Sequence, residues 1–240
     1  IQPEVCEDGI VKDGDSTSSS QALLQIDIND PDDGDEFNLG DTVDIDVTVK
    51  NEDDNEMDVV VEALLYDMDD SDEITTVESN SIEINDDDEE DFTLELKIPQ
   101  DPDLDEDHDY TIFIKAYEDG DEDQNCNEES IDIDLEKNDH DVVIDEILVN
   151  PSTVSCGETV NVDISIVNIG TRDEEGVYID LKNPSLKLDQ RSNSFDLDKE
   201  DDLTKNFVFS IPSDAEDKTY DLEAIVYFDD GDEKKGVFSN

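Results

Sequence analysis

The chain has 240 residues, of which 75 are Asp or Glu and 14 are Lys or Arg, so its net charge is −61. This charge excludes nucleic-acid binding through a basic surface, because no cluster of cations exists to displace phosphate counterions. It also disfavours direct contact with an anionic lipid surface, and no apolar run reaches the ~18 residues of a transmembrane helix. We therefore expect neither a nucleic-acid partner nor direct membrane insertion.

The composition is that of a folded β protein in spite of the charge. Leu, Ile, Val and Phe supply 65 of the 240 residues. This share is above the roughly 20% below which a highly charged chain is typically disordered. Ile and Val far outnumber Leu and Ala, which favours strands over helices.

The first part of the chain predicts an extended segment followed by a β domain. Residues 1–20 are expected to be the extended N-terminal segment, and residues 21–138 the first domain. Apolar and polar residues then alternate at period two, which indicates strands with one buried face. The predicted strands are 23–28, 40–49, 59–65, 74–84, 92–98, 110–117 and 131–135.

The second part repeats this pattern in residues 139–240, after a short linker at 136–141. Gly40 to Val49 matches Gly157 to Ile166, and each copy later reaches a Gly-Asp-Glu turn. The matching strands are 142–149, 157–166, 177–181, 203–212 and 220–227. Two copies of about seven short strands each predict an all-β protein with two tandem immunoglobulin-like β-sandwich domains.

Tyr110 and Tyr220 occupy the same place in the two copies, where the sixth predicted strand begins. This is the position of a tyrosine corner, in which the hydroxyl bonds to nearby backbone. The alternative is an ordinary core tyrosine.

The second domain ends soon after its last turn, so its final strand is expected to be short or missing. The preceding strand would then have an open edge that accepts a strand from another subunit. The alternatives are a truncated chain whose next domain is absent and a short edge strand that needs no partner. The residues assigned to the open edge are Val226, Phe228, Val237 and Phe238, and those of the candidate donor segment are Glu4, Ile10 and Val11.

A family resemblance rests on the segment from Pro151 to Gly170, with its Gly157-Glu158 pair and its Asn168-x-Gly170 turn. This segment resembles the CARDB-type (cell-adhesion-related) immunoglobulin-like modules of prokaryotic surface proteins. The acidic hairpin at 119–129 is similar to a hairpin of that family, and tandem copies resemble surface-layer (S-layer) proteins of archaea. The resemblance implies structural or adhesive roles at the cell surface and brings no catalytic residues. The first copy departs from it, because its turn after residue 49 lacks the Asn-x-Gly.

The abundance of Asp and the scarcity of Lys look like the surface of proteins from extreme halophiles. Like charges this dense repel one another at ordinary ionic strength, and molar salt screens them within ~3 Å. The alternative is an acidic Ca²⁺-binding or mineral-associated protein.

The three cysteines are sorted by the expected topology. The segment before the first strand and the loop before the last strand lie at the same end of an immunoglobulin-like sandwich, so Cys6 and Cys126 are predicted to pair. Cys156, at the opposite end of the other domain, would be free or bonded to another subunit. The alternative is three reduced thiols. A disulfide would favour an oxidising, extracellular location. The absence of a starting Met indicates that a signal peptide has been removed or that the chain is a fragment.

Calcium is the one plausible ligand, because its preferred oxygen donors are abundant. The candidates lie in acidic loops, and none matches the EF-hand pattern. A solvated acidic face is the alternative, and no cofactor is required. The candidate ligands are Asp101, Asp103, Asp105, Asp107, Asp119, Asp121 and Asp123, together with the loop 30–35.

Catalytic patterns are not found in the sequence. Carboxylate pairs occur everywhere by chance in so acidic a chain, and His108 and His140 are far apart in predicted loops. We therefore expect a non-enzymatic extracellular protein that forms a surface layer or filament by contacts with itself or with other surface proteins. The alternatives are a Ca²⁺- or protein-binding adhesion module and an accessory fragment of a larger secreted protein.

Overall fold

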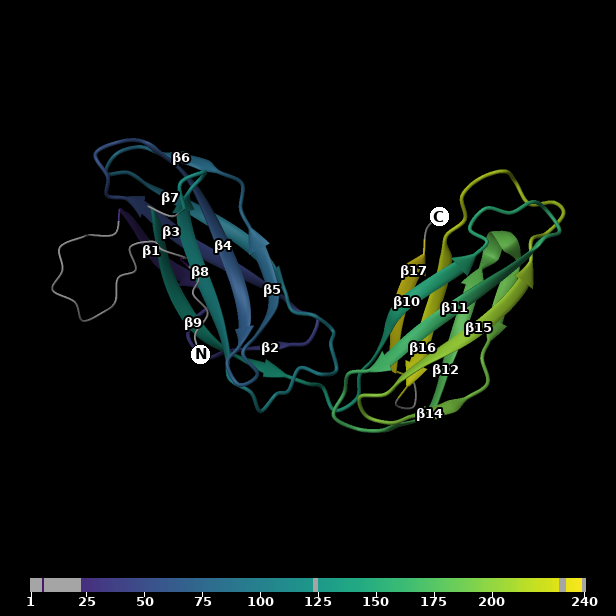
Figure 1. Ribbon diagram of the computed structural model, residues 1–240. Coiled ribbons are helices and arrows are strands. Elements are labelled where there is room, and N and C mark those ends of the chain that lie inside the picture. Colours follow the sequence, from purple (N-terminus) through teal and green to yellow (C-terminus); the bar gives the residue numbers. More distant parts are fainter. Residues whose placement is uncertain (1–5, 7–22, 123–124, 229–231, 239–240) are drawn as a thin grey trace. The chain divides into compact units, whose positions relative to one another are not determined.

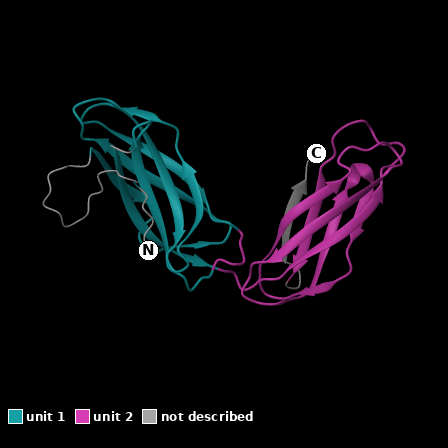
Figure 2. Ribbon diagram, viewed as in Figure 1, with its two compact units in different colours: residues 1–99, 105–136 teal, residues 100–104, 137–240 magenta. Residues whose placement is uncertain are grey.

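The computed structural model describes Cys6 and residues 23–122, 125–228 and 232–238, the last range as backbone only. The chain divides into two compact units (Figure 2). Unit 1 comprises residues 1–99 and 105–136, and unit 2 comprises residues 100–104 and 137–240.

Unit 1 is a β-sandwich of two sheets (Figure 1). One sheet has the order β1-β3-β7, and the other has the order β2-β9-β8-β4-β5, with β6 also paired to β4. The strands are β1 Leu24–Asp30, β2 Asp35–Asn38, β3 Thr42–Asn51, β4 Met57–Asp67, β5 Asp72–Glu78, β6 Ile82–Ile84, β7 Glu89–Lys97, β8 Tyr110–Glu118 and β9 Cys126–Glu136.

The alternating sequence explains these strands. In β3, Val43, Ile45, Val47 and Val49 are fully buried, whereas the residues between them face outward. Such a strand can place only one face against a core, so two sheets must pack face to face. The all-β immunoglobulin-like prediction is confirmed.

The predicted fourth strand, 74–84, differs in the structure. It is two strands, β5 and β6, and both pair with β4 rather than with the sheet of β1, β3 and β7. The side chains of β5 are exposed or half-buried, so their alternation carried no information about which sheet the strand would join.

Unit 2 repeats the sandwich with the sheets β10-β11-β15 and β13-β12-β16-β17, and β14 pairs with β12. Its core lies between them and includes Val162, Ile164, Ile179 and Val226. The elements are β10 Val142–Asn150, β11 Thr159–Asn168, β12 Glu174–Asn183, the 3-10 helix η1 Pro184–Leu186, β13 Leu188–Arg191, β14 Phe195–Leu197, β15 Asp202–Ser210, β16 Leu222–Phe228 and β17 Asp232–Phe238.

The last strand of unit 2 is short but not missing. β17 has 7 residues against 11 in β9, and it pairs with β16 along its whole length. The predicted open edge at Val226 and Phe228 is therefore wrong, since β17 covers it and both side chains are buried in the core. Val237 and Phe238 belong to β17 itself.

In both units, a buried asparagine at the end of a strand, β3 in unit 1 and β11 in unit 2, holds the turn that follows. Asn51 donates through Nδ2 to the carbonyl oxygens of Asn55 (2.8 Å) and Ile84 (3.1 Å). Asn168 does the same to Arg172 (2.8 Å). Both asparagines are fully buried, so each exchanges water for backbone partners and holds the following turn.

Only unit 2 needs glycine in this turn. A Cβ atom on Gly170 would lie 2.7 Å from the backbone nitrogen of Asp141, which is closer than real Cβ atoms approach. This accounts for the Asn-x-Gly sequence, and the equivalent residue Asp53 in unit 1 keeps only the bond from its backbone N–H to Asn51 (2.9 Å).

The tyrosine corner is present in both units. The Tyr110 hydroxyl donates to the carbonyl oxygen of Asp105 (3.0 Å) and accepts from its backbone N–H (3.1 Å). The Tyr220 hydroxyl donates to the carbonyl oxygen of Glu216 (3.0 Å). These bonds fix the loop that precedes β8 in unit 1 and β16 in unit 2.

The structure contains the predicted disulfide between Cys6 and Cys126, while Cys156 is free and exposed. No helix in the described part of the chain is long and apolar enough to span a membrane.

Candidate functional site

The repeat allows the same end of the two sandwiches to be compared residue by residue. Gly40 and Gly157 stand at equivalent positions, with φ of 86° and 84°. The backbone N–H of Asn38 donates to the carboxylate of Asp41 (2.9 Å), and that of Ser155 donates to the carboxylate of Glu158 (2.7 Å). The loop that leads into β3 and the loop that leads into β11 are therefore built alike.

Leu39 of unit 1 is buried beside this turn, and Leu104 belongs to the segment 100–104 that is assigned to unit 2. Leu39 directly precedes Gly40, and Leu104 directly precedes Asp105, whose backbone holds the corner tyrosine. Both leucines are 7% exposed. The two loops are joined at the adjacent strands, because the N–H of Ile98 donates to the carbonyl oxygen of Asp41 (2.9 Å).

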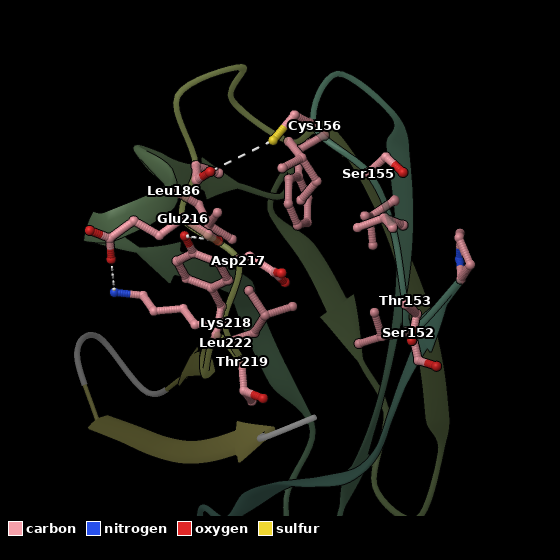
Figure 3. A pocket seen from close by; sticks show the side chains of 18 residues that line it. Ser152, Thr153, Ser155, Cys156, Leu186, Glu216, Asp217, Lys218, Thr219 and Leu222 are labelled. Carbon is pink, nitrogen blue, oxygen red and sulfur yellow. Dashed lines mark hydrogen bonds and ion pairs between the residues drawn. The ribbon is translucent and has the colours of Figure 1, made fainter.

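The equivalent residue of unit 2 is smaller. Cys156 precedes Gly157 in the place of Leu39, and Ala215 precedes Glu216, whose backbone holds the other corner tyrosine. Both line a pocket of about 670 Å³ at this end of the sandwich (Figure 3). At the position of the buried Leu39, unit 2 has the exposed Cys156 beside the pocket, so this position is filled in unit 1 and open in unit 2.

The pocket has apolar walls and a polar rim. The apolar residues that line it include Val149, Val154, Val160, Phe209, Ile211 and Leu222. At the rim the Cys156 thiol donates to the carbonyl oxygen of Ala215 (3.7 Å), and Lys218 pairs with Glu216 (2.8 Å) (Figure 3). The lining as a whole mixes apolar and polar residues, with Ser152, Thr153 and Ser155 beside the apolar ones.

Among the described residues, the structure does not bring the predicted calcium ligands together. Asp101 and Asp105 each accept a bond from the backbone N–H two residues later, at Asp103 and Asp107 (both 3.0 Å), so they form local turns. Asp119 and Asp121 lie in the turn after β8, where their N–H groups bond to backbone oxygens. In the loop 30–35 the N–H of Asp32 donates to the carboxylate of Asp35 (3.0 Å). Asp123 lies outside the described residues, as do the donor residues Glu4, Ile10 and Val11.

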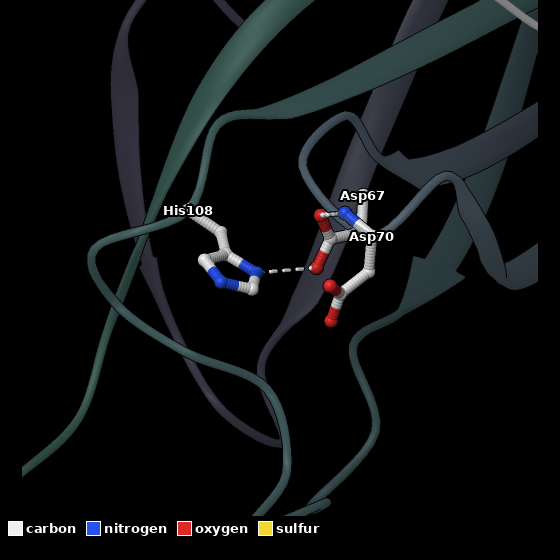
Figure 4. Close-up of side chains that lie close together, drawn as sticks. All are labelled: Asp67, Asp70 and His108. Atoms are coloured by element: carbon white, nitrogen blue, oxygen red, sulfur yellow. Dashed lines mark hydrogen bonds and ion pairs between the residues drawn. The ribbon is translucent and has the colours of Figure 1, made fainter. Parts of the chain in front are cut away.

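Among the described residues, one group of three carries ligand atoms that lie within 4.8 Å of one another: Asp67, Asp70 and His108 (Figure 4). Asp67 ends β4 and is buried, and its Oδ2 atom lies 2.8 Å from Nδ1 of His108. Its Oδ1 atom accepts the backbone N–H groups of Asp69 (2.9 Å) and Asp70 (3.0 Å).

The electrostatics favour an ion pair in this group. The hydrogen bond to Asp67 raises the pKa of His108, and the nearby carboxylates add to the effect. Burial would raise the pKa of Asp67, but the bonds from Asp70, His108 and Asp69 outweigh it and lower that pKa. Because Asp67 already bonds to His108 and to the N–H groups of Asp69 and Asp70, we interpret the group as a link between the β4–β5 turn and the loop before β8.

Unit 2 also carries a cationic aromatic patch, which we define as Tyr178, Asp180, Lys182, Arg191 and Tyr227. The rings of Tyr178 and Tyr227 stack with centroids 4.8 Å apart, and the guanidinium of Arg191 lies 4.2 Å from the centroid of Tyr178. Asp180 is buried and holds Arg191 by two bonds of 2.7 and 2.9 Å. Those bonds, aided by Lys182, lower the pKa of Asp180. The Arg191 side chain remains 59% exposed.

Sequence reasoning missed the pocket, although a signal was present. Aligning the copies at Gly40 and Gly157 sets the apolar Leu39 against Cys156. The His108–Asp67 contact left no such signal, since 41 residues separate its partners.

Comparisons with known proteins show likeness of fold at most. No family model and no curated protein matches the chain. Similar solved structures include red sea bream transglutaminase (15% identity, TM-score 0.32, 92% of this chain and 31% of that chain). Others are Salmonella alpha-2-macroglobulin (9%, 0.45, 91% and 16%) and a Paenibacillus cycloisomaltooligosaccharide glucanotransferase (19%, 0.32, 43% and 13%). The chain spans less than a third of the length of each.

Proposed function

We propose that this protein is a non-enzymatic, extracellular structural protein that associates with itself in concentrated salt to form a surface layer or filament. The observation that carries this proposal is the open pocket of unit 2, at the end where unit 1 buries Leu39. The apolar residues that line such a pocket are costly to leave in water, so the pocket is suited to receive part of a neighbouring subunit.

The net charge and the disulfide support an extracellular environment of high salt concentration. A net charge of −61 opposes both folding and association at low ionic strength, and molar salt removes most of that repulsion. The Cys6–Cys126 disulfide is typical of proteins outside the reducing cytosol. Both features fit a protein that works outside the cell in brine.

The cationic aromatic patch of unit 2 supports a second contact. Tyr and Arg are enriched at the centres of protein interfaces, and Asp180 holds Arg191 in place before any partner arrives. Most other charges on this chain are acidic, so a second copy offers the complementary sign.

Electron microscopy and light scattering of the protein in molar salt, with and without a calcium chelator, test the proposal. Filaments or lattices that dissolve on dilution of the salt are the expected result. Loss of the assemblies on chelation would add calcium as a bridge between acidic faces. A monomer at all salt and protein concentrations would overturn the proposal.

A further inference from the structure

We propose that the cationic aromatic patch of unit 2 binds strand β5 of unit 1 in a second copy of this chain, with the guanidinium of Arg191 on the carboxylate of Glu78. This inference rests on the proposed self-association and names the two surfaces that meet in the second contact. The acceptor is a fixed guanidinium, and the ligand is a carboxylate on an exposed strand.

The guanidinium of Arg191 has one edge in use. Its Nε and Nη2 atoms donate to the carboxylate of Asp180, at 2.7 and 2.9 Å. The N–H groups of Nη1 and the second N–H of Nη2 point along another edge of the same plane, where a carboxylate can accept two parallel bonds. The side chain is 59% exposed, so this edge is accessible to a partner.

The patch holds the guanidinium before a partner arrives. Asp180 is 2% exposed and lies under it, and the stacked rings of Tyr178 and Tyr227 have their centroids 4.2 and 6.0 Å from its central carbon. A side chain fixed in this way loses little conformational freedom on binding. A planar, fixed guanidinium is suited to a planar carboxylate.

Unit 1 carries an acidic residue where unit 2 carries Arg191. In each unit, two cross-strand pairs stand two residues apart on the central strand, which is β4 in unit 1 and β12 in unit 2. The corresponding pairs are Val60–Tyr117 and Tyr178–Tyr227, followed by Glu62–Glu78 and Asp180–Arg191. Glu78 on β5 therefore occupies the place of Arg191 on β13.

The charges at this place are inverted between the units. In unit 2 the carboxylate is buried and the guanidinium is exposed. In unit 1 the cation Lys115 is 8% exposed and lies between Glu62 (3.3 Å) and Glu122 (2.9 Å). Glu78 is exposed, and its Oε2 atom accepts a long bond from the Tyr117 hydroxyl (3.3 Å). Unit 1 thus offers a carboxylate at the position where unit 2 offers a guanidinium.

A second copy is the occupant that these charges select. Each copy carries one face with the guanidinium and one face with the carboxylate. The contact is therefore heterologous, and every copy that is added leaves one face of each kind open. Contacts of this type give rings when they close and filaments when they do not, so this one contact can propagate an assembly.

The contact is compatible with concentrated salt. Molar salt shortens the screening length to ~3 Å, which removes most of the long-range repulsion between copies with a net charge of −61. Groups in hydrogen-bond contact lie within that length and keep their attraction. The contact is therefore expected to form in molar salt and to dissociate on dilution.

Charge reversal in the full chain tests the contact. Glu78→Arg and Arg191→Glu each place like charges opposite one another, and each is expected to raise the protein concentration needed for assembly by about tenfold or more. Arg172→Glu is the control for the second variant, because Arg172 is 61% exposed and also pairs with a carboxylate. Glu95→Arg, at an exposed position of β7 in the other sheet, is the control for the first. Both controls are expected to assemble as the unaltered chain does.

Sedimentation velocity in molar salt measures the assembly, and thermal unfolding shows that each variant is folded. Arg191→Gln keeps an N–H donor for Asp180 and replaces Arg191→Glu if that variant does not fold, with a rise in the same direction expected. Mixing Glu78→Arg with Arg191→Glu is expected to restore assembly, because every contact between the two variants then joins unlike charges.

The proposed contact is overturned if Glu78→Arg assembles at the same concentration as the unaltered chain. It is also overturned if the mixture of the two folded variants stays monomeric. In either case the proposed self-association stands, provided that the unaltered chain assembles. An unaltered chain that stays monomeric would overturn the proposed function itself.

Discussion

The two units are built on one repeat but close the same end of the sandwich differently. Unit 1 buries Leu39 at that end and adds β2 to the neighbouring sheet. Unit 2 keeps the same turn, the same corner tyrosine and the same buried asparagine, but it places Cys156 at the position of Leu39. The scaffold is therefore held by the turn and corner residues, and the end can be opened without disturbing it.

The disulfide gives the largest expected difference between the units. Replacing both Cys6 and Cys126 by Ser removes a cross-link over a sequence separation of 120, which is expected to destabilise unit 1 by about 4–5 kcal/mol. Denaturation in molar salt, with hydrogen exchange resolving the units, measures the loss. Cys156→Ser is the control, and an equal loss of stability in unit 2 would contradict independent units.

Creating a cavity in unit 1 should give the next largest loss of stability. Leu39→Ala is expected to cost unit 1 about 2–4 kcal/mol, because it removes a side chain that is 7% exposed and leaves a cavity. The same denaturation experiment measures it. Leu148→Ala, at a site that is 52% exposed, should cost far less, and equal costs would refute the role of Leu39 as a buried packing residue.

The two tyrosine corners should differ in strength. Tyr110 is 1% exposed, and its hydroxyl both donates and accepts, so Tyr110→Phe is expected to cost about 2 kcal/mol. Tyr220 is partly exposed and donates to Glu216, so Tyr220→Phe is expected to cost about 0.5 kcal/mol. Paired stability measurements decide this, and the reverse order would show that Tyr220 is the stronger corner.

Filling the pocket of unit 2 should have a smaller effect on stability, and this effect should be stabilising. Ala215→Leu fills part of the pocket and is expected to stabilise monomeric unit 2 by about 1 kcal/mol. Thermal unfolding at a protein concentration too low for association measures this, with Ser213→Leu as control. A destabilised unit 2 would indicate that the pocket cannot accommodate leucine.

The ion pair between Asp67 and His108 should be detectable when His108 is titrated. Asp67→Asn is expected to lower the pKa of His108 towards 6.5, because it removes the main cause of the raised value. The ion pair should stabilise unit 1 fully between pH 3.8 and pH 6.5. Its contribution fades as pH rises through the folded pKa of His108 or falls through that of Asp67. NMR titration of the imidazole measures the shift, with Asp44→Asn as a matched removal of charge; a shift equal to that control would contradict the pairing.

The sequence predicted the features that alternate or repeat. The period-two pattern of residues such as Val43 and Ile45 requires one buried face, and the repeated position of Tyr110 and Tyr220 indicates the corner. The pairing of Cys6 with Cys126 follows once the topology is expected.

The features that sequence reasoning missed depend on contacts with no local pattern. β17 begins with Asp-Glu-Lys-Lys-Gly, which has no alternation, so only its pairing with β16 makes it a strand. The place of β5 is decided by Glu62 to Asp67 of β4 across the sheet. The partner of His108 is one carboxylate among dozens of others, so position in the chain could not select it.

The disulfide also has a mechanical consequence for a chain that bears load within an array. Tension applied between residue 6 and unit 2 would pass directly from Cys6 to Cys126, so the 119 residues between them stay outside the line of force. Those residues would otherwise extend by roughly 400 Å. Unit 1 would therefore yield only through β9, while unit 2, which has no such bridge among its described residues, would be the element that extends under strain.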